Sequence, residues 1–239
     1  MAKNRIFILG LISIAIFFQS CLKDEETYSL AIGTTKLIEG NRYYFDIDDN
    51  EKMLPNDTSS IQDYKAIDGQ RAFIYFSLLD KKISGYDYNA KVIHIENILT
   101  KNIIPLTEET TDSIGDDRIN ITNMWLGGEH LNIEFQLMGT LSSQKPHMVN
   151  LVQKQMATNN NIDEYLELEF RHNAHNDPPN QLRNGIVSFR LKNINTNNYK
   201  GIKIRANTIY DGIKYYTINF THNPQIIKKN KGILNRQIN

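Results

Sequence analysis

Short segments of alternating apolar and polar residues recur along the chain. The clearest runs from Leu131 to Leu137, and this period of two is typical of a strand with one buried face. We expect its apolar side chains to face a core and its polar ones to face water: Leu131, Ile133, Phe135 and Leu137 inside, Asn132, Glu134 and Gln136 outside. The other segments with strand patterns are Arg42–Ile47, Arg71–Leu79, Lys91–Ile98, Tyr165–Arg171, Gly185–Leu191, Ile202–Ala206 and Tyr215–Phe220.

Turn-forming residues fill the gaps between these segments, and no long stretch has the 3.6-residue period of a helix. The turn signals are Asp48-Asp49-Asn50, Asp68-Gly69, Gly127-Gly128, Asp177-Pro178-Pro179 and Asp211-Gly212. Short, closely spaced strands predict an all-β protein built as a sandwich or a small barrel.

The alternation weakens between Thr100 and Asp117, where Thr, Asp and Glu are frequent. We therefore predict two domains, with a small five-stranded barrel over residues 29–104 and a β-sandwich over residues 105–222. Residues 223–239 contain basic residues and no acid, and we expect this tail to be disordered.

The first twenty residues have the pattern of a secretory signal peptide. Lys3 and Arg5 precede an apolar run from Ile6 to Phe18, which is shorter than the roughly 20 residues of a membrane-spanning helix. Ser20 then precedes Cys21, the only cysteine, and this ending resembles the lipobox of bacterial lipoproteins. The resemblance implies cleavage before Cys21 and lipidation of its thiol. A plain secretory signal with an incidental cysteine is the alternative.

Lipidation of Cys21 would leave a soluble protein tethered to a membrane through residues 21–28, because several acyl chains anchor far more strongly than one. Lys23, Asp24, Glu25 and Glu26 follow the cysteine. A Lys followed by acids at this place resembles the signal that exports lipoproteins to the outer face of the outer membrane. The alternatives are a solvated linker and an anchor on the periplasmic face.

Composition excludes several function classes. The chain has 27 basic and 27 acidic residues, and removal of residues 1–20 takes away two basic residues and no acidic one, which leaves a formal charge of −2. Strong binding of nucleic acid is therefore not expected. With Cys21 lipidated, no thiol remains for disulfides, thiolate zinc sites or a cysteine nucleophile.

Several segments together resemble the NigD-like lipoprotein family. They are Asp68–Arg71, Ile98–Lys101, Asp112–Gly115, Trp125–Gly128, Leu131–Phe135, His147–Leu151 and Leu168–Ala174. The resemblance covers most of the mature chain and implies an N-terminal OB fold followed by a C-terminal β-sandwich. The family name comes from a bacteriocin operon, and the resemblance implies no established activity.

The densest group of polar residues is the segment from Arg171 to Asp177. Arg171, His172, His175 and Asp177 follow a predicted strand, and loops at sandwich ends often carry binding residues. They are candidate ligand contacts. Two alternatives are a loop whose polar side chains satisfy its own turn and a metal site, for which no further ligand is identifiable.

Aromatic residues form a second candidate contact. Tyr86 and Tyr88 flank Asp87 after Gly85, and with Trp125 they could stack against sugar rings. Trp125 lies near the predicted domain boundary, which favours interdomain packing, whereas the two tyrosines are expected in an exposed loop.

Two further groups of residues, each with two carboxylates, are explained more simply by structure. Asp46, Asp48 and Asn50 have the spacing of a calcium loop, but Glu51 stands where the sharp turn needs Gly, which favours a hairpin. Glu167 and Glu169 lie on one strand face, whereas glycosidase carboxylates flank a sugar from opposite sides, so we expect a solvated face.

The motifs of common enzymes are absent from the sequence: no P-loop, GxGxxG, GxSxG or HExxH occurs. We therefore expect a non-catalytic, lipid-anchored protein that binds an envelope protein, a peptide or a glycan, with no cofactor. One alternative is a hydrolase of surface glycan or peptide that uses His172, His175 and Asp177. Another is an accessory or immunity protein for a secreted antibacterial peptide.

Overall fold

The computed structural model of the chain describes residues 28–40, 42–48, 50–140, 145–154, 164–192, 194–196, 198–220 and 234–235. The predicted signal peptide, Cys21 and nearly all of the tether lie outside these residues. So does the basic tail, except for Leu234–Asn235. Among the described residues, no helix has the length and hydropathy needed to span a membrane.

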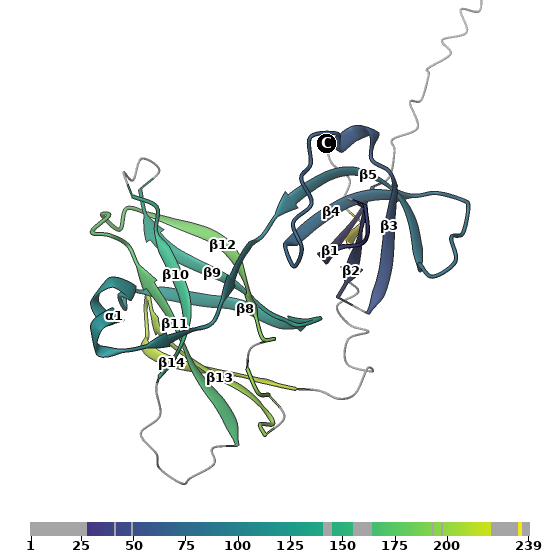
Figure 1. The fold of residues 1–239 in the computed structure, drawn as a ribbon. Coiled ribbons are helices and arrows are strands. Elements are labelled where there is room, and N and C mark those ends of the chain that lie inside the picture. Colours follow the sequence, from purple (N-terminus) through teal and green to yellow (C-terminus); the bar gives the residue numbers. More distant parts are fainter. Residues whose placement is uncertain are drawn as a thin grey trace, which may run out of the picture.

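The N-terminal part is a closed five-stranded barrel (Figure 1). Its strands pair in the order β1-β2-β3-β5-β4, and β4 pairs back with β1. A short 3₁₀ helix, η1, lies between β3 and β4 along the chain, and β15 pairs with the first two residues of β1. The bounds are β1 Ser29–Leu37, β2 Tyr43–Ile47, β3 Glu51–Asp57, η1 Ser59–Ile61, β4 Arg71–Leu78, β5 Tyr88–Asn97 and β15 Leu234–Asn235.

Apolar side chains fill the barrel because one face of each strand points inward. The largest fully buried ones are Phe45, Ile47, Met53, Ile74 and Phe76. The spacing of Asp46 to Asn50 indeed belongs to a hairpin, in which Phe45 pairs with Met53 across the turn.

The C-terminal part is a sandwich of two sheets. One sheet has the order β14-β13-β11-β10-β7 and the other the order β6-β12-β9-β8, and helix α1 lies between β7 and β8. The bounds are β6 Leu99–Asn102, β7 Ile104–Leu106, α1 Glu108–Ile114, β8 Ile119–Gly127, β9 His130–Gly139, β10 Met148–Lys154, β11 Tyr165–Asn173, β12 Gln181–Arg190, β13 Gly201–Thr208 and β14 Gly212–Asn219.

The sandwich core contains the apolar residues that the alternation of Leu131–Leu137 predicts. Phe170 of β11 packs against Phe135 and Phe189, with ring centroids 5.8 and 6.1 Å apart. The two sheets are thus joined by aromatic contacts across the core.

The segment from Thr100 to Asp117, predicted as the domain boundary, contains regular secondary structure. β6 pairs with β12, and β7 pairs with β10, so residues 99–106 belong to the sheets of the sandwich. Helix α1 begins with a capping box in which Thr107 and Thr110 bond each other's backbone. Thr-rich sequence therefore marks a helix start here, and the chain passes from barrel to sandwich at Ile98, between β5 and β6.

A network of buried polar groups joins the two domains; we call Arg71, Asp48, Asn132 and Trp125 the junction network. Arg71 of the barrel is fully buried, and its Nη2 donates to Asp48 Oδ2 at 2.8 Å and to Asn132 Oδ1 of the sandwich at 3.2 Å. Trp125 Nε1 donates to Asp48 Oδ2 at 3.3 Å, which confirms its predicted interdomain role.

Asn132 corrects the prediction that the polar face of β9 is wet. Its side chain is fully buried because this face of the sheet meets the barrel. Arg71 of the barrel and Ser188 of β12 both donate to the side-chain oxygen Oδ1 of Asn132. Backbone periodicity locates a strand face but does not say whether a second domain covers it.

Candidate functional site

The predicted polar loop is divided between a strand and a turn. Arg171 and His172 lie within β11 and are buried, so the strand runs past its predicted end at Arg171 and the expectation of a loop is wrong for His172. His175 and Asp177 follow the strand, and His175 has a left-handed backbone with φ 51°. Since β11 pairs with β10 in the register His172 to Val149, the residues just before β10 reach this end of the sandwich.

His147, which precedes β10, links His172 to Asp177; we call these three residues with Thr140 the histidine cluster. His147 Nδ1 lies 2.9 Å from His172 Nε2, and His147 Nε2 lies 3.0 Å from Asp177 Oδ2. His172 Nδ1 lies 3.1 Å from the backbone oxygen of Arg118. The backbone N–H and the hydroxyl of Thr140 each donate to Asp177 at 2.6 Å.

These contacts restrict where the protons lie. The Arg118 carbonyl can only accept, so His172 carries a proton on Nδ1, and the Asp177 carboxylate accepts from His147 Nε2. One of the two rings donates the hydrogen bond between His147 Nδ1 and His172 Nε2. Burial lowers the pKa of His172, and the Thr140 hydrogen bonds lower the pKa of Asp177 to about 2.

The hydrogen-bonding groups of the histidine cluster are paired with one another, and its histidine and aspartate side chains are largely buried. The His147 and Asp177 side chains are 9% and 5% exposed, and every ring nitrogen of the two linked histidines has a partner. Among the described residues, the hydroxyl of this cluster belongs to Thr140, and it already donates to Asp177 and is not poised as a nucleophile. His175 bonds the Pro146 carbonyl instead and does not join this chain of contacts.

Arg171 belongs to a separate ion network on β11. Its Nε donates to Glu169 Oε2 at 2.6 Å, and Lys154 and Arg205 also reach the Glu169 carboxylate. Burial raises the pKa of Glu169, but hydrogen bonds from Lys154 and Arg171 outweigh it, and the pKa ends below its usual value. Glu169 is therefore not on a solvated face as expected, whereas Glu167 is exposed and pairs with Lys203.

Trp125, Tyr86 and Tyr88, the residues predicted to form an aromatic platform, make separate contacts in the structure. Tyr88 is the first residue of β5, where its hydroxyl donates to Glu51 and its ring packs near Phe76. Tyr86 lies in the preceding turn and packs edge-on against Tyr44, with centroids 6.0 Å apart. Both rings are half-buried, and each packs against a different aromatic side chain of the barrel.

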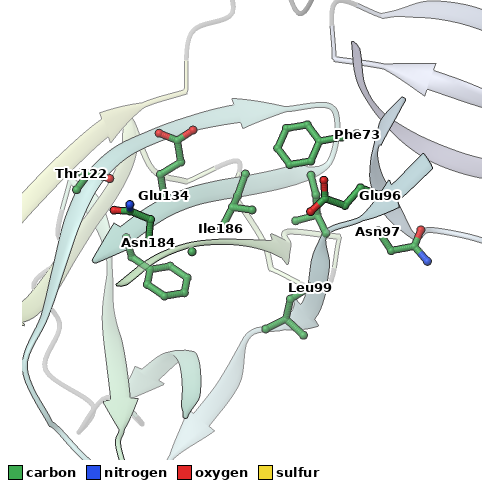
Figure 2. Close-up of a pocket in the computed structure, with 11 residues that line it drawn as sticks. Phe73, Glu96, Asn97, Leu99, Thr122, Glu134, Asn184 and Ile186 are labelled. Atoms are coloured by element: carbon green, nitrogen blue, oxygen red, sulfur yellow. The ribbon is translucent and has the colours of Figure 1, made fainter. Parts of the chain in front are cut away.

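A cleft of about 520 Å³ lies where the outer face of the β6-β12-β9-β8 sheet meets the ends of β4 and β5 (Figure 2). Figure 2 shows Phe73, Glu96 and Asn97 of the barrel on one side and Thr122, Glu134 and Asn184 of the sandwich on the other. Ile186 lies between them and Leu99 at the edge. This volume is in the range of small-ligand sites, which often lie between domains.

The cleft differs from the buried networks in its unpaired groups. Among the residues that the structure describes, Glu96 and Glu134 form no ion pair, and no Lys, Arg or His lines the cleft. Asn184 accepts a hydrogen bond from Gln136 at 3.0 Å, while the Asn97 and Thr122 side chains have no recorded partner within the described part of the chain. The cleft thus offers negative charge and free hydrogen-bonding groups beside apolar surface.

The sequence does not reveal the cleft because its lining residues come from six separate strands and from both domains. Only Glu134 carried a signal, as an outward-facing position of the alternating strand. No described group of His, Asp or Glu side chains has an arrangement that could hold a metal ion.

Two family profiles match consecutive parts of the chain. The NigD-like N-terminal OB domain matches residues 32–98, and the NigD-like C-terminal β-sandwich domain matches residues 102–220. The chain belongs to the NigD-like family. The resemblance and the fold class read from the sequence are both confirmed, and the profile boundary agrees with the start of β6 at Leu99.

Solved structures share the arrangement of this NigD-like protein. A protein of unknown function from Bacteroides vulgatus has 29% sequence identity and a TM-score of 0.70, over 82% of this chain and 92% of that one. A NigD-like immunity protein from Bacteroides caccae has 18% identity and a TM-score of 0.57, with coverage of 80% and 92%. A candidate lipoprotein from Bacteroides fragilis has 11% identity and a TM-score of 0.57, with coverage of 81% and 98%. No curated protein matches the chain.

Proposed function

We propose that this NigD-like protein is a non-catalytic binding protein, anchored by lipid to the outer membrane and facing the cell exterior, whose ligand occupies the cleft between its domains. The observation that carries the proposal is the pair of unpaired carboxylates, Glu96 and Glu134, in a cleft of about 520 Å³. A concave site in which a few polar groups converge beside apolar surface favours a binding role.

The anchor is supported by sequence and by one relative. Cys21 ends a signal-peptide pattern, and Lys23 to Glu26 follow it as in surface-exported lipoproteins. The Bacteroides fragilis structure of the same fold is described as a candidate lipoprotein. The anchor would hold both domains within reach of envelope proteins, peptides and glycans, with the periplasmic face as the alternative address.

A hydrolase is less well supported. The residues it would use, His172, His175 and Asp177, do not form one catalytic unit, because His175 bonds Pro146 and the other two are linked through His147. The linked groups are buried and already paired with one another. Alanine replacement of the trio should therefore affect folding and leave any binding by the cleft intact in the folded fraction.

The second candidate function is an accessory or immunity role toward a secreted antibacterial peptide. The Bacteroides caccae structure with this fold is called a NigD-like immunity protein. Such a role is compatible with a cleft that binds a peptide. Deletion of the gene should then increase the sensitivity of the cells to that peptide, and unchanged sensitivity to every peptide tested would exclude the role.

Mild crosslinking on intact cells, followed by purification through a C-terminal tag, tests the binding function. Asn184→Trp fills the cleft from β12, while Asn180→Trp places the same side chain in an exposed turn outside it. We expect a defined crosslinked species with the wild-type chain and with Asn180→Trp, and its loss with Asn184→Trp. The same species in all three would show that the ligand binds elsewhere.

Lipidation and exposure at the cell surface are tested separately. Cys21→Ala should abolish labelling by radioactive palmitate and release the protein from membranes. Neutral replacement of Lys23 to Glu26 should keep the label but protect the protein from protease added to intact cells, if these residues direct it to the surface. Protection of the wild-type chain would instead support the periplasmic face.

A further inference from the structure

The two carboxylates of the cleft belong to different domains. Glu96 lies on β5 of the barrel, paired in register with Phe73 of β4, and Glu134 lies on β9 of the sandwich, paired with Ile186 of β12. The junction network holds the two domains at this place, since Arg71 bonds both Asp48 and Asn132. The carboxylates therefore face one shared space from fixed supports.

Glu96 and Glu134 differ in their pairing from the carboxylates of the protein's ion networks. Asp48 has Arg71, Asp116 has Arg205, and Glu169 has Arg171 and Lys154, each within 3 Å. Within the described ranges, Glu96 and Glu134 have none. A concave site lined by one sign of charge concentrates ions of the opposite sign, so the cleft attracts cations and repels phosphate, sulfate and carboxylate ligands.

The rest of the lining selects among cations. Leu99 is 54% exposed, and together with Phe73 and Ile186 it provides aliphatic and aromatic surface. Carbohydrate sites rely on flat aromatic faces, whereas this mixed wall suits the apolar side chains of a peptide. The Asn97 amide and the Thr122 hydroxyl can bond a peptide backbone, because each side chain is free among the described residues.

We propose that the cleft binds an extended peptide segment in which an arginine or lysine side chain reaches Glu96 and Glu134 while a neighbouring apolar side chain packs on Phe73, Leu99 and Ile186. This assignment rests on the proposed binding function and adds the ligand class to it. A guanidinium presents several N–H donors in a plane, a geometry that suits carboxylate acceptors.

Titration calorimetry on the purified mature protein in detergent tests the ligand class. The probes are two libraries of capped tetrapeptides that differ only at the second residue, which is arginine in one and citrulline, its neutral isostere, in the other; the remaining positions hold mixed apolar and polar residues. Chitosan oligomers serve as a cationic glycan. We expect the arginine library to bind at least about tenfold more tightly than the citrulline library at low salt.

Three variants test whether the preference for the arginine library arises in the cleft. Glu96→Gln with Glu134→Gln should remove the difference between the two libraries. Glu39→Gln with Glu109→Gln changes net charge equally at exposed positions outside the cleft and should preserve it. Asn184→Trp should abolish binding of both libraries.

Three results would overturn the assignment. Equal binding of the two libraries that is lost with Asn184→Trp would contradict the cationic ligand and leave the binding function intact. Tighter binding of chitosan than of either library would replace the peptide with a glycan. Failure of every probe, together with crosslinking in cells that is unaffected by Asn184→Trp, would contradict both the ligand class and the binding function.

Discussion

The histidine cluster and the cleft are the two polar regions of this molecule that resemble functional sites, and they differ in how their charges are used. In the cluster, the carboxylate of Asp177 has three donors, and both rings of the His147–His172 pair are bonded on each side. In the cleft, Glu96 and Glu134 have no described partner. A dense group of polar residues can thus serve the fold, while a sparse pair remains open to a ligand.

The same comparison separates stability from binding. Polar groups that are buried and paired are costly to disturb, because removal of one partner leaves the other unsatisfied. Exposed groups without partners are cheap to remove. Substitutions in the junction network and the histidine cluster should therefore lower stability, while substitutions in the cleft should change binding alone.

The largest effect is expected from Arg71→Met. The substitution leaves Asp48, whose side chain is 11% exposed, as an unpaired charge between the domains, and it should lower the free energy of unfolding by about 3–5 kcal/mol. Binding by the cleft should weaken as well, because the two walls lose their common support. Denaturant unfolding measures the first effect and calorimetry the second.

The double variant Arg71→Met with Asp48→Asn is the control for this prediction. It removes the unpaired charge and should recover part of the lost stability. Equal losses in the single and double variants would mean that Arg71 contributes through packing and not through the ion pair.

His172→Ala should have the next largest effect on stability. It leaves the Arg118 carbonyl and His147 Nδ1 without a partner and opens a cavity in the sandwich, which together cost about 2–4 kcal/mol. Binding by the folded protein should be unchanged. His175→Asn is the matched control, since Asn tolerates the left-handed backbone at φ 51° and should change stability by less than about 0.5 kcal/mol.

Loss of binding in His172→Ala without loss of stability would reverse the comparison. It would make the histidine cluster the site and the cleft a structural gap.

Acid should destabilise the protein through its buried histidines. Burial, with the nearby charges of Arg71, Arg190 and Lys36, lowers the pKa of His130 from 6.5 to about 3. The unfolded chain then binds more protons than the folded one between these pH values, so stability is highest above pH 6.5 and falls as pH drops toward 3. The slope from one such proton is at most about 1.4 kcal/mol per pH unit.

His172 acts in the same direction, because burial also lowers its pKa. Denaturant unfolding at several pH values should show a smaller slope for His130→Leu than for the wild-type chain. An unchanged slope in this variant would mean that His130 takes up its proton without loss of the fold.

The smallest effect on stability is expected from Glu96→Gln with Glu134→Gln. Removing two like charges that have no described partner should change the free energy of unfolding by less than about 0.5 kcal/mol, or raise it slightly. Thermal unfolding at low and high salt measures this effect. A loss of 2 kcal/mol or more would show that the carboxylates support the fold and would end the contrast with the histidine cluster.

The sequence predicted the fold class, the two domains and the family because these depend on local alternation and on contiguous segments. It predicted the burial of Leu131, Ile133 and Phe135 for the same reason. It placed Asn132 and Glu169 in water, since nothing in a strand's own pattern shows that a barrel or an ion network will cover its polar face.

The candidate site was harder to predict. Arg171 to Asp177 attracted attention because their polar residues are adjacent in sequence, yet His147, the residue that links His172 to Asp177, is distant in sequence. The cleft residues are spread from Phe73 to Ile186, and only tertiary packing brings them together. Which carboxylates lack a partner is a property of the whole fold.

Photocrosslinking in living cells tests the central claim most directly. A benzophenone side chain at position 136 lies at the rim of the cleft, because Gln136 there donates to Asn184 without lining the cleft itself, and the same side chain at position 175 lies beside the histidine cluster. We predict a defined adduct from position 136 that disappears with Glu96→Gln and Glu134→Gln, and no such adduct from position 175. An adduct from position 175 alone, or one from position 136 that survives removal of both carboxylates, would contradict the account.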